Sequence, residues 1–183
     1  MDYEQQLKEI VRSEDWLMEL LRTVRTLGLH DWYIAAGAIR NTVWDRLHGF
    51  THTPLQDVDV VYFTRSDLRS STDTQYEALL EKKQATVTWN VFNQARAHLR
   101  SPGREPARCT EDGVKYWPET PTCVGVRLET DDSLTILAPW ELRDLFALVI
   151  RPIPEPFLSK ELYQKRQAKK KWKEKWPQLT YVN

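Results

Sequence analysis

Apolar residues near the N-terminus recur at steps of three and four, the spacing of one face of an α-helix. The positions that share it are Leu7, Ile10, Val11, Leu17, Met18, Leu21 and Val24. Ser13, followed by Glu14 and Asp15, is a residue type that caps helix N-termini, so we expect a second helix to begin there. Gly28 is expected to end this helical stretch, because glycine is favoured just past the last turn of a helix.

Runs of β-branched and aromatic residues, typical of strands, alternate with helical spacing in the middle of the chain. Residues 93–100 have no clear period. The expected elements are strand 31–36, helix 38–47, loop 48–56, strand 57–63, helix 74–84, strand 86–92 and loop 101–108. Strands alternating with helices predict an α/β or α+β domain with a mixed sheet flanked by helices.

The last third of the chain ends in a basic segment. The expected elements are helix 110–116, a hairpin of strands 124–128 and 134–137, helix 140–150, and helix 159–175. Three prolines, Pro152, Pro154 and Pro156, predict a stiff connector before the final helix. Trp172 and Trp176 lie four residues apart, on one helical face. We therefore expect one domain over 1–151, with 152–183 packing back onto it.

Composition places the chain among ordinary globular proteins. It has 183 residues, 41% of them hydrophobic and 28% charged, which fits a single domain with its own core. Its two cysteines, Cys109 and Cys123, form neither a disulfide framework nor a metal-type pair. No signal peptide and no apolar run long enough to span a bilayer is apparent, so we expect a cytoplasmic protein without a membrane partner.

The charge of the chain is unevenly distributed. Residues 160–175 hold eight Lys or Arg and two Glu, a local net of +6, although the whole chain has a net charge of zero. The rest of the chain therefore carries −6. This basic tail is interpreted either as a solvated helix face, which we favour, or as a surface that meets a polyanion.

Asp57 and Asp59 are the most informative pair of residues. In a strand, side chains at i and i+2 point to the same face, while Val58 and Val60 point to the other. Two carboxylates side by side repel each other unless a positive charge lies between them. Mg²⁺ is such a charge, because it prefers carboxylate, phosphate and water oxygens. The alternative is a solvated Asp-x-Asp at the start of a strand.

A second feature lies about twenty residues upstream of this pair. The small-residue turn at 36–38 leads from a strand into a helix that carries Arg40 and Asn41. A helix N-terminus offers free backbone N–H groups to phosphate, and Gly37 lets a phosphate approach the backbone closely. Arg40 is suited to pair with phosphate oxygens. The alternative is a turn that needs small residues only for packing.

Other polar and aromatic residues support less specific hypotheses. The cluster Asn93, Gln94, Arg96 and His98 either faces the same pocket or forms a solvated turn. His48 and His52 lack zinc spacing and are expected in an exposed loop. Trp117 and Trp140 are expected in the core.

The turn "AAGAIRN" followed by "DVDVVYF" resembles the nucleotidyltransferase superfamily that includes DNA polymerase β and the CCA-adding enzymes. A group of bacterial nucleotidyltransferase-like proteins is similar over about residues 16–177, through the stretches "DWYIAAGAIRNTVWDRLHG", "DVDVVYF", "NQARAH", "WPETPTCVGVRL" and "APWELRDLFALVIRP". The resemblance implies a polymerase-β-type palm. It also implies that Asp57 and Asp59 hold one or two Mg²⁺, or Mn²⁺, while Gly37, Ala38, Arg40 and Asn41 bind a nucleoside triphosphate.

Two positions depart from the family pattern. Ala36 replaces the first glycine of the turn, which is mild provided that its φ is negative. The third carboxylate of the family falls at Asn90, which has an amide oxygen but no charge. A two-metal site would then lose part of its charge balance. Asp67 and Glu119 are the acids that we consider as substitutes in space.

These features predict a metal-dependent enzyme that moves a nucleoside monophosphate from a triphosphate to an acceptor hydroxyl of RNA or protein, releasing pyrophosphate. Asn90 supports an alternative, a pseudoenzyme of the same fold that binds nucleotide or RNA without turnover. A third hypothesis, an interaction domain with an inert strand, leaves the coincidence of turn and acids unexplained.

Overall fold

The computed structural model describes residues 2–100, 104–154, 158 and 160–182. Five strands form its main sheet, in the order β3-β2-β1-β4-β5. β2 and β3 are parallel and the other neighbours are antiparallel, so the expected mixed sheet is confirmed. The strands are β1 (Tyr33–Ala35), β2 (Val58–Tyr62), β3 (Trp89–Asn93), β4 (Gly125–Leu128) and β5 (Leu134–Leu137).

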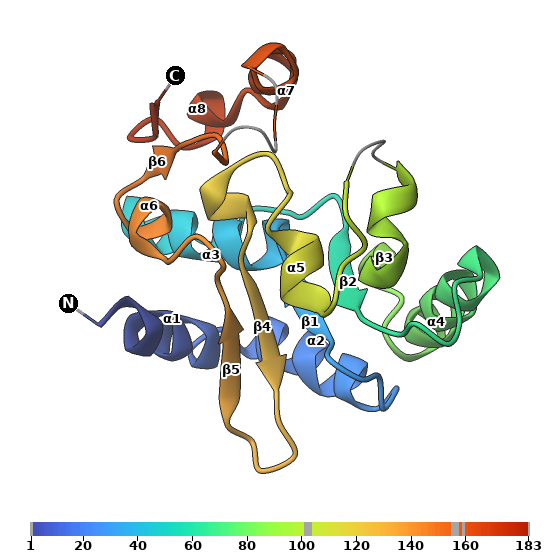
Figure 1. The fold of residues 1–183 in the computed structure, drawn as a ribbon. Helices are drawn as coiled ribbons and strands as arrows, with labels where there is room; N and C mark the ends of the chain where they lie inside the picture. The colour runs from blue at the N-terminus through green and yellow to red at the C-terminus, as the bar shows by residue number, and fades with distance from the viewer. Residues whose placement is uncertain (1, 101–103, 155–157, 159, 183) are drawn as a thin grey trace.

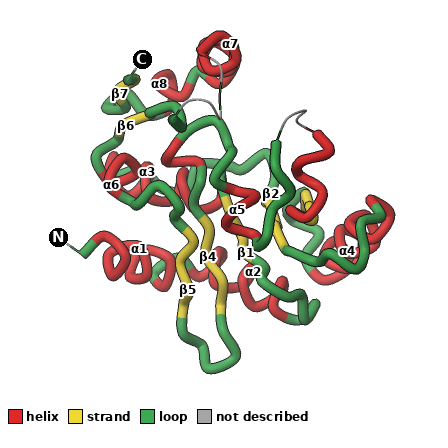
Figure 2. Tube along the Cα trace, viewed as in Figure 1, coloured by secondary structure: helices red, strands yellow, loops and turns green. Residues whose placement is uncertain are grey.

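Helices surround this sheet, whose strands gather near the centre of the molecule (Figure 2). The longer ones are α1 (Tyr3–Arg12), α2 (Asp15–Arg25), α3 (Gly37–His48), α4 (Ser70–Lys83) and α7 (Lys160–Lys170). The short ones are α5 (Thr110–Val114), α6 (Arg143–Phe146), α8 (Trp172–Lys175) and the 3₁₀ turns η1 (Gln94–Arg100) and η2 (Thr120–Thr122). In the described part of the chain, none of these helices has the length and apolar character that a bilayer span requires.

The two faces of β2 lie in different environments. Val58, Val60 and Tyr62 are buried in the large core that helices α1 to α3 also build. Val61 belongs to a smaller apolar cluster with Tyr33 on the opposite face. Because side chains alternate along a strand, Asp59 shares the face of Val61, as the sequence predicted. Asp59 therefore lies on the face of β2 opposite the main core.

The C-terminal segment packs at one end of the molecule, opposite the protruding β4–β5 turn (Figure 1). Trp172 and Trp176 are buried, with exposed fractions of 4% and 1%, in the same core as Trp44 of α3. Both rings meet Trp44 edge to face, at centroid distances of 5.6 and 5.2 Å. The indole N–H of Trp176 also donates to Asp45 of α3 over 2.7 Å. The expected packing of these two tryptophans against the body of the protein is confirmed.

Two expected helices in the C-terminal part are wrong in extent. The helix expected over 140–150 is reduced to α6, because Glu141 and Leu148 on either side have positive φ. The chain continues instead as β6 (Val149–Ile150), which pairs in parallel with β7 (Thr180–Tyr181). The final helix divides into α7 and α8 at Lys171, whose left-handed φ of 49° interrupts it.

Smaller corrections concern element ends. Ser13 ends α1, and Glu14 occupies the N-cap of α2, so the expected cap is displaced by one residue. The third strand begins at Trp89 instead of residue 86. Residues 94–100, which had no clear period in the sequence, form the 3₁₀ turn η1 that follows it. In the proline connector, Pro152 bridges to Glu119, while Pro156 lies outside the described residues.

Candidate functional site

The small-residue turn and the acidic pair lie side by side because β1 and β2 are neighbours. Ala35, at the end of β1, is the register partner of Asp59. Opposed residues of antiparallel strands have Cβ atoms about 5 Å apart, which brings the start of α3 to the acids. Gly37, Asp57 and Asp59 accordingly line one cavity of about 240 Å³, the first cavity. Asn41 and Arg40 complete this wall, so the structure brings these predicted residues together.

The turn itself departs from expectation at Ala36. This residue has φ 49° and ψ −117°, so the condition under which alanine would be a mild replacement, a negative φ, is not met. Its carbonyl accepts hydrogen bonds from the N–H groups of Ile39 and Arg40. The N–H groups of Gly37 and Ala38 belong to the first turn of α3, where helices lack internal acceptors. Ala38 is fully buried and is not among the described residues that line either cavity, unlike Gly37.

Arg40 forms a buried part of the cavity wall. Its Nη1 donates to Thr122 and its Nη2 to Asn41, both over 2.9 Å. The guanidinium lies over the rings of Trp44 and Trp172, at 5.0 and 4.4 Å from their centroids. Burial lowers the pKa of Arg40 to about 10, while the charge of Glu119 opposes this shift. Arg40 is therefore fixed before any ligand arrives.

Glu119 balances two of the cations behind this wall. It is fully buried and accepts from Arg166 over 2.6 Å and from Thr122 over 3.0 Å. Thr122 in turn accepts from Arg40, so η2 connects α7 to α3. A buried carboxylate with two hydrogen-bond donors is satisfied in place. Glu119 is thus a structural partner of the cations behind the cavity.

Asn90, which the family resemblance places at the third acid, lies beside Asp59. This residue of β3 is the register partner of Asp59, and its Nδ2 donates to Asp59 Oδ1 over 2.7 Å. Burial raises the pKa of Asp59, the charge of Asp57 raises it further, and the Asn90 hydrogen bond opposes both. Among the described residues that line either cavity at this site, neither of the two suggested substitutes, Asp67 and Glu119, appears. Asp67 instead binds Arg69 and Thr72.

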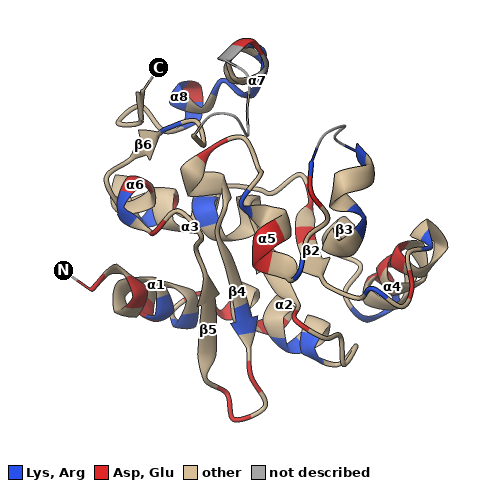
Figure 3. Ribbon diagram, viewed as in Figure 1, with Lys and Arg blue, Asp and Glu red and all other residues tan. Residues whose placement is uncertain are grey.

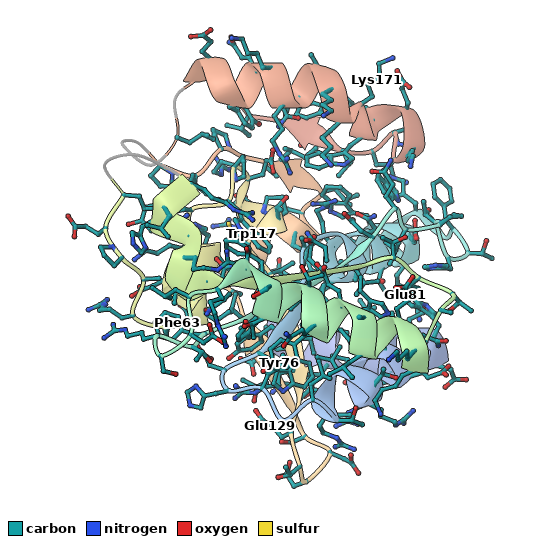
Figure 4. All side chains as sticks on the ribbon, turned by 90° about the vertical axis from the view of Figure 1, so that its right-hand side faces the viewer. Phe63, Tyr76, Glu81, Trp117, Glu129 and Lys171 are labelled. Atoms are coloured by element: carbon teal, nitrogen blue, oxygen red, sulfur yellow. The ribbon has the colours of Figure 1, made fainter. Side chains whose placement is uncertain are left out.

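A second cavity, of about 400 Å³, meets the first at the acidic pair. Asp57 and Asp59 line both. The second cavity continues along the same face of the sheet past Asn90 and Phe92. Its far wall contains Trp117, seen between α7 and α4 in Figure 4. Asp57 and Asp59 therefore lie where the first and second cavities meet.

The C-terminal basic residues form the wall of the first cavity that sequence reasoning missed. Arg166, Lys169, Lys170 and Lys175 line it together with the acids, and Figure 3 shows this concentration of Lys and Arg on α7 and α8. The favoured interpretation of a solvated helix face is therefore incomplete. The sequence signal for this placement was the interleaving of Trp172 and Trp176 with the lysines, which anchors the segment.

The donor set fits one hard cation better than two. Asp57 and Asp59 supply carboxylate oxygens on one cavity wall. Within the described ranges, no group of three or more His, Cys, Asp and Glu is arranged to hold a metal ion. Mg²⁺ commonly binds one or two carboxylates and completes its octahedron with phosphate and water oxygens. The acidic pair suits a cation that a phosphate-bearing ligand shares.

The remaining candidates have mostly structural contacts. His48 Nδ1 lies 2.7 Å from the Trp44 carbonyl, and the His52 ring packs on Trp16. In the polar cluster that begins at the end of β3, the amide of Asn93 bonds to Thr64 and Asp67. Gln94 is the member of that cluster that lines the second cavity.

The model of a nucleotidyltransferase family matches residues 22–181. A solved structure described as revealing a CCA-adding enzyme head domain is 31% identical, covering 98% of this chain and 95% of that one, with a TM-score of 0.84. A search of curated proteins finds no match.

Larger enzymes share the fold at lower identity. A CCA-adding enzyme in complex with CTP is 13% identical with a TM-score of 0.58, and a tRNA-processing enzyme in an apo form is 16% identical with a TM-score of 0.55. This chain covers 44% of the length of each.

Proposed function

The chain belongs to the nucleotidyltransferase family, and from that membership we propose that it transfers a nucleoside monophosphate from a triphosphate to an acceptor hydroxyl. One observation carries the proposal. Asp57 and Asp59 share a cavity with the Gly37 turn, while α7 and α8 supply cations across from them. A phosphate-binding helix terminus beside a cation-binding acidic pair is what nucleotidyl transfer requires.

The first cavity holds the triphosphate in this proposal. The N–H groups of Gly37 and Ala38 donate to phosphate oxygens at the positive end of α3. Arg40 and Asn41 border the phosphates, and Lys169 and Lys175 lie among the cations of the opposite wall. Five Arg and Lys side chains face two Asp in this cavity, a balance that favours a polyanion.

Asp57 and Asp59 would hold one Mg²⁺ or Mn²⁺ together with the phosphates. When bound, the cation neutralises charge that develops on the transferred phosphoryl group and eases deprotonation of the attacking hydroxyl. The acceptor oxygen forms a bond to the α-phosphorus, and the bond from that phosphorus to the β-bridging oxygen breaks. Pyrophosphate leaves with the electron pair, and the hydroxyl proton passes to solvent. Asn90 braces Asp59 through its hydrogen bond.

A second candidate function is supported by the same residue. Asn90 brings no negative charge to the position of the third acid. Its amide also donates a hydrogen bond to Asp59 Oδ1, so one lone pair of that oxygen is already in use. A protein that binds nucleotide or RNA without turnover would keep the cavity and lose the activating charge. Transfer of label from a radioactive triphosphate to RNA or protein acceptors separates the two: label transfer that depends on Asp59 supports the enzyme, and binding without transfer supports the binder.

The binding step is tested by replacing the acidic pair. Asp57→Ala with Asp59→Ala is expected to abolish Mg²⁺-dependent binding of a non-hydrolysable triphosphate, measured by calorimetry. The matched control is Glu81→Ala with Glu105→Ala, which removes two exposed acids outside both cavities. Unchanged triphosphate binding by the Asp57 and Asp59 variant would remove the enzyme from consideration.

A further inference from the structure

Resting on the proposed function, we infer that the second cavity is the acceptor site and that it takes the terminal nucleotide of a single-stranded nucleic acid. The inference combines three observations: how the two cavities meet, what lines the second, and which of its cations are unpaired.

The way the cavities meet determines the direction of attack. In phosphoryl transfer the attacking and leaving oxygens lie roughly in line. Gly37 and Asn41 line the first cavity alone, so pyrophosphate leaves on that side of the acids. Asn90 lines the second cavity alone, on the other side of Asp59. An in-line hydroxyl therefore reaches the α-phosphorus through the second cavity.

The lining of that cavity combines aromatic rings with guanidinium groups. Arg100 lies 3.8 Å from the centroid of the Phe92 ring, and Arg104 lies 4.0 Å from that of Tyr116. Flat aromatic and guanidinium surfaces stack on nucleobases, and the same cations bind the backbone phosphate. The sheet supplies Phe92, while the segment around α5 supplies Tyr116 from the other side. A protein hydroxyl without a base or phosphate uses neither feature.

The cations in this cavity are available to an anion. Arg100 is exposed and makes no hydrogen bond or ion pair with any described residue. Lys170, which lines both cavities, is crowded by Arg166 and Arg40, and burial together with these like charges lowers its pKa. Four Arg and Lys side chains oppose Asp57 and Asp59 here. A phosphate entering the cavity relieves this repulsion.

The volume supports one nucleotide and not a folded segment. About 400 Å³ falls at the lower end of the range of small-ligand pockets, about 300–1,000 Å³. The rest of the strand would extend over the basic surface of α7 and α8, where Lys165, Lys169, Lys173 and Lys175 are exposed.

The test measures binding of a fluorescein-labelled single-stranded RNA decamer with a free 3′ hydroxyl, by anisotropy. Arg100→Ala with Arg104→Ala is expected to weaken binding by about tenfold, since base stacking and phosphate contacts are both lost. Arg65→Ala is the matched control, because Arg65 lies over the Phe63 ring at 5.5 Å but lines neither cavity. Circular dichroism checks that each variant folds, and Phe92→Leu repeats the test without changing charge.

Triphosphate binding distinguishes this inference from the proposed function. Calorimetry is expected to show unchanged triphosphate affinity in the Arg100 and Arg104 variant. Unchanged RNA affinity would overturn the inference and leave the proposed function standing. A parallel loss of triphosphate affinity would also overturn it, because the second cavity would then hold the nucleoside of the triphosphate.

Label transfer gives a further test of the acceptor. Transfer of label to a serine-containing peptide, at a rate that replacing Arg100 does not change, would overturn the inference in favour of a protein acceptor. RNA binding that needs Arg100 in a protein that binds no triphosphate would support the nucleic-acid site and overturn only the reaction.

Discussion

Asn90 of β3 donates a hydrogen bond to Asp59 of β2 across 2.7 Å, in a parallel register that places the two residues side by side. The family pattern predicts an acid at this position, and a third carboxylate there would add to the repulsion between Asp57 and Asp59. The amide instead stabilises Asp59 without a cation. The Asn90 hydrogen bond and the charge of Asp57 therefore act on the pKa of Asp59 in opposite directions.

Replacing this amide is the first prediction. Asn90→Asp is expected to tighten Mg²⁺ binding and to raise the rate of nucleotidyl transfer, because a third carboxylate increases the attraction for a divalent cation. Without Mg²⁺ the same variant is expected to be less stable than the parent, because three carboxylates then repel one another. Calorimetric Mg²⁺ titration and thermal unfolding with and without Mg²⁺ measure both effects. Asn90→Ala is the control, since it removes the hydrogen bond without adding charge, and tighter Mg²⁺ binding by that variant would contradict the argument.

Ala36 is the basis of the second prediction. Its φ of 49° is favoured by glycine and costs other residues free energy. Ala36→Gly is expected to increase the free energy of unfolding by about 1 kcal/mol, as relief of this strain outweighs the extra entropy of glycine in the unfolded chain. Urea denaturation measures the change.

The control for this substitution lies two residues further along. Ala38 is fully buried within α3. Ala38→Gly is expected to lower the free energy of unfolding by about 1 kcal/mol, because glycine is unfavourable in a helix. A decrease in the free energy of unfolding for Ala36→Gly, like that expected for Ala38→Gly, would show that the turn at Ala36 is not strained.

The sequence predicted the strand at 57–63, one residue longer at each end than β2 (Val58–Tyr62), because the alternation of side chains is a local pattern. Val58 and Val60 alternate with the acids, and this period alone assigns them to opposite sides. The turn before α3 was also apparent, since a small-residue segment precedes helical spacing. Both features depend on neighbouring residues in the sequence, so they can be predicted without knowledge of tertiary contacts.

Other features depend on tertiary contacts that a single sequence does not contain. Residues 140–150 have apolar spacing suited to a helix, yet positive φ at Glu141 and Leu148 ends that helix early and allows β6 to pair with β7. The basic tail has the composition of a solvated face, and only the burial of Trp172 and Trp176 shows that it closes a cavity. Each feature depends on contact between segments that are distant in the sequence: β6 with β7, and the basic tail with the first cavity.

The third prediction concerns this C-terminal wall. Trp176 is buried, and its indole N–H donates to the buried Asp45. Trp176→Phe keeps an aromatic ring but removes the donor, so we expect the free energy of unfolding to fall by about 2 kcal/mol. Lys173→Ala, an exposed change in the same segment, is expected to alter it by less than about 0.5 kcal/mol. A single unfolding transition, shifted as a whole by Trp176→Phe, would show that residues 152–183 fold with the rest of the chain. A separate early transition would show that they do not.

The last prediction uses the two cysteines as probes of the site in its folded state. Cys123 follows Thr122, has an exposed fraction of 1%, and its thiol donates to the Trp117 and Glu119 carbonyls. Burial raises the pKa of the Cys123 thiol, and the nearby charge of Glu119 raises it further. Because the thiolate is the reactive form, we expect iodoacetamide to modify the partly exposed Cys109 in the native protein and to modify Cys123 only after unfolding. Peptide mass spectrometry of samples quenched before and after addition of urea measures this difference. Thr122 of η2 is hydrogen-bonded to both Arg40 and Glu119. Rapid modification of Cys123 in the native protein would mean that the η2 segment opens without global unfolding. The wall behind the first cavity would then not be rigid.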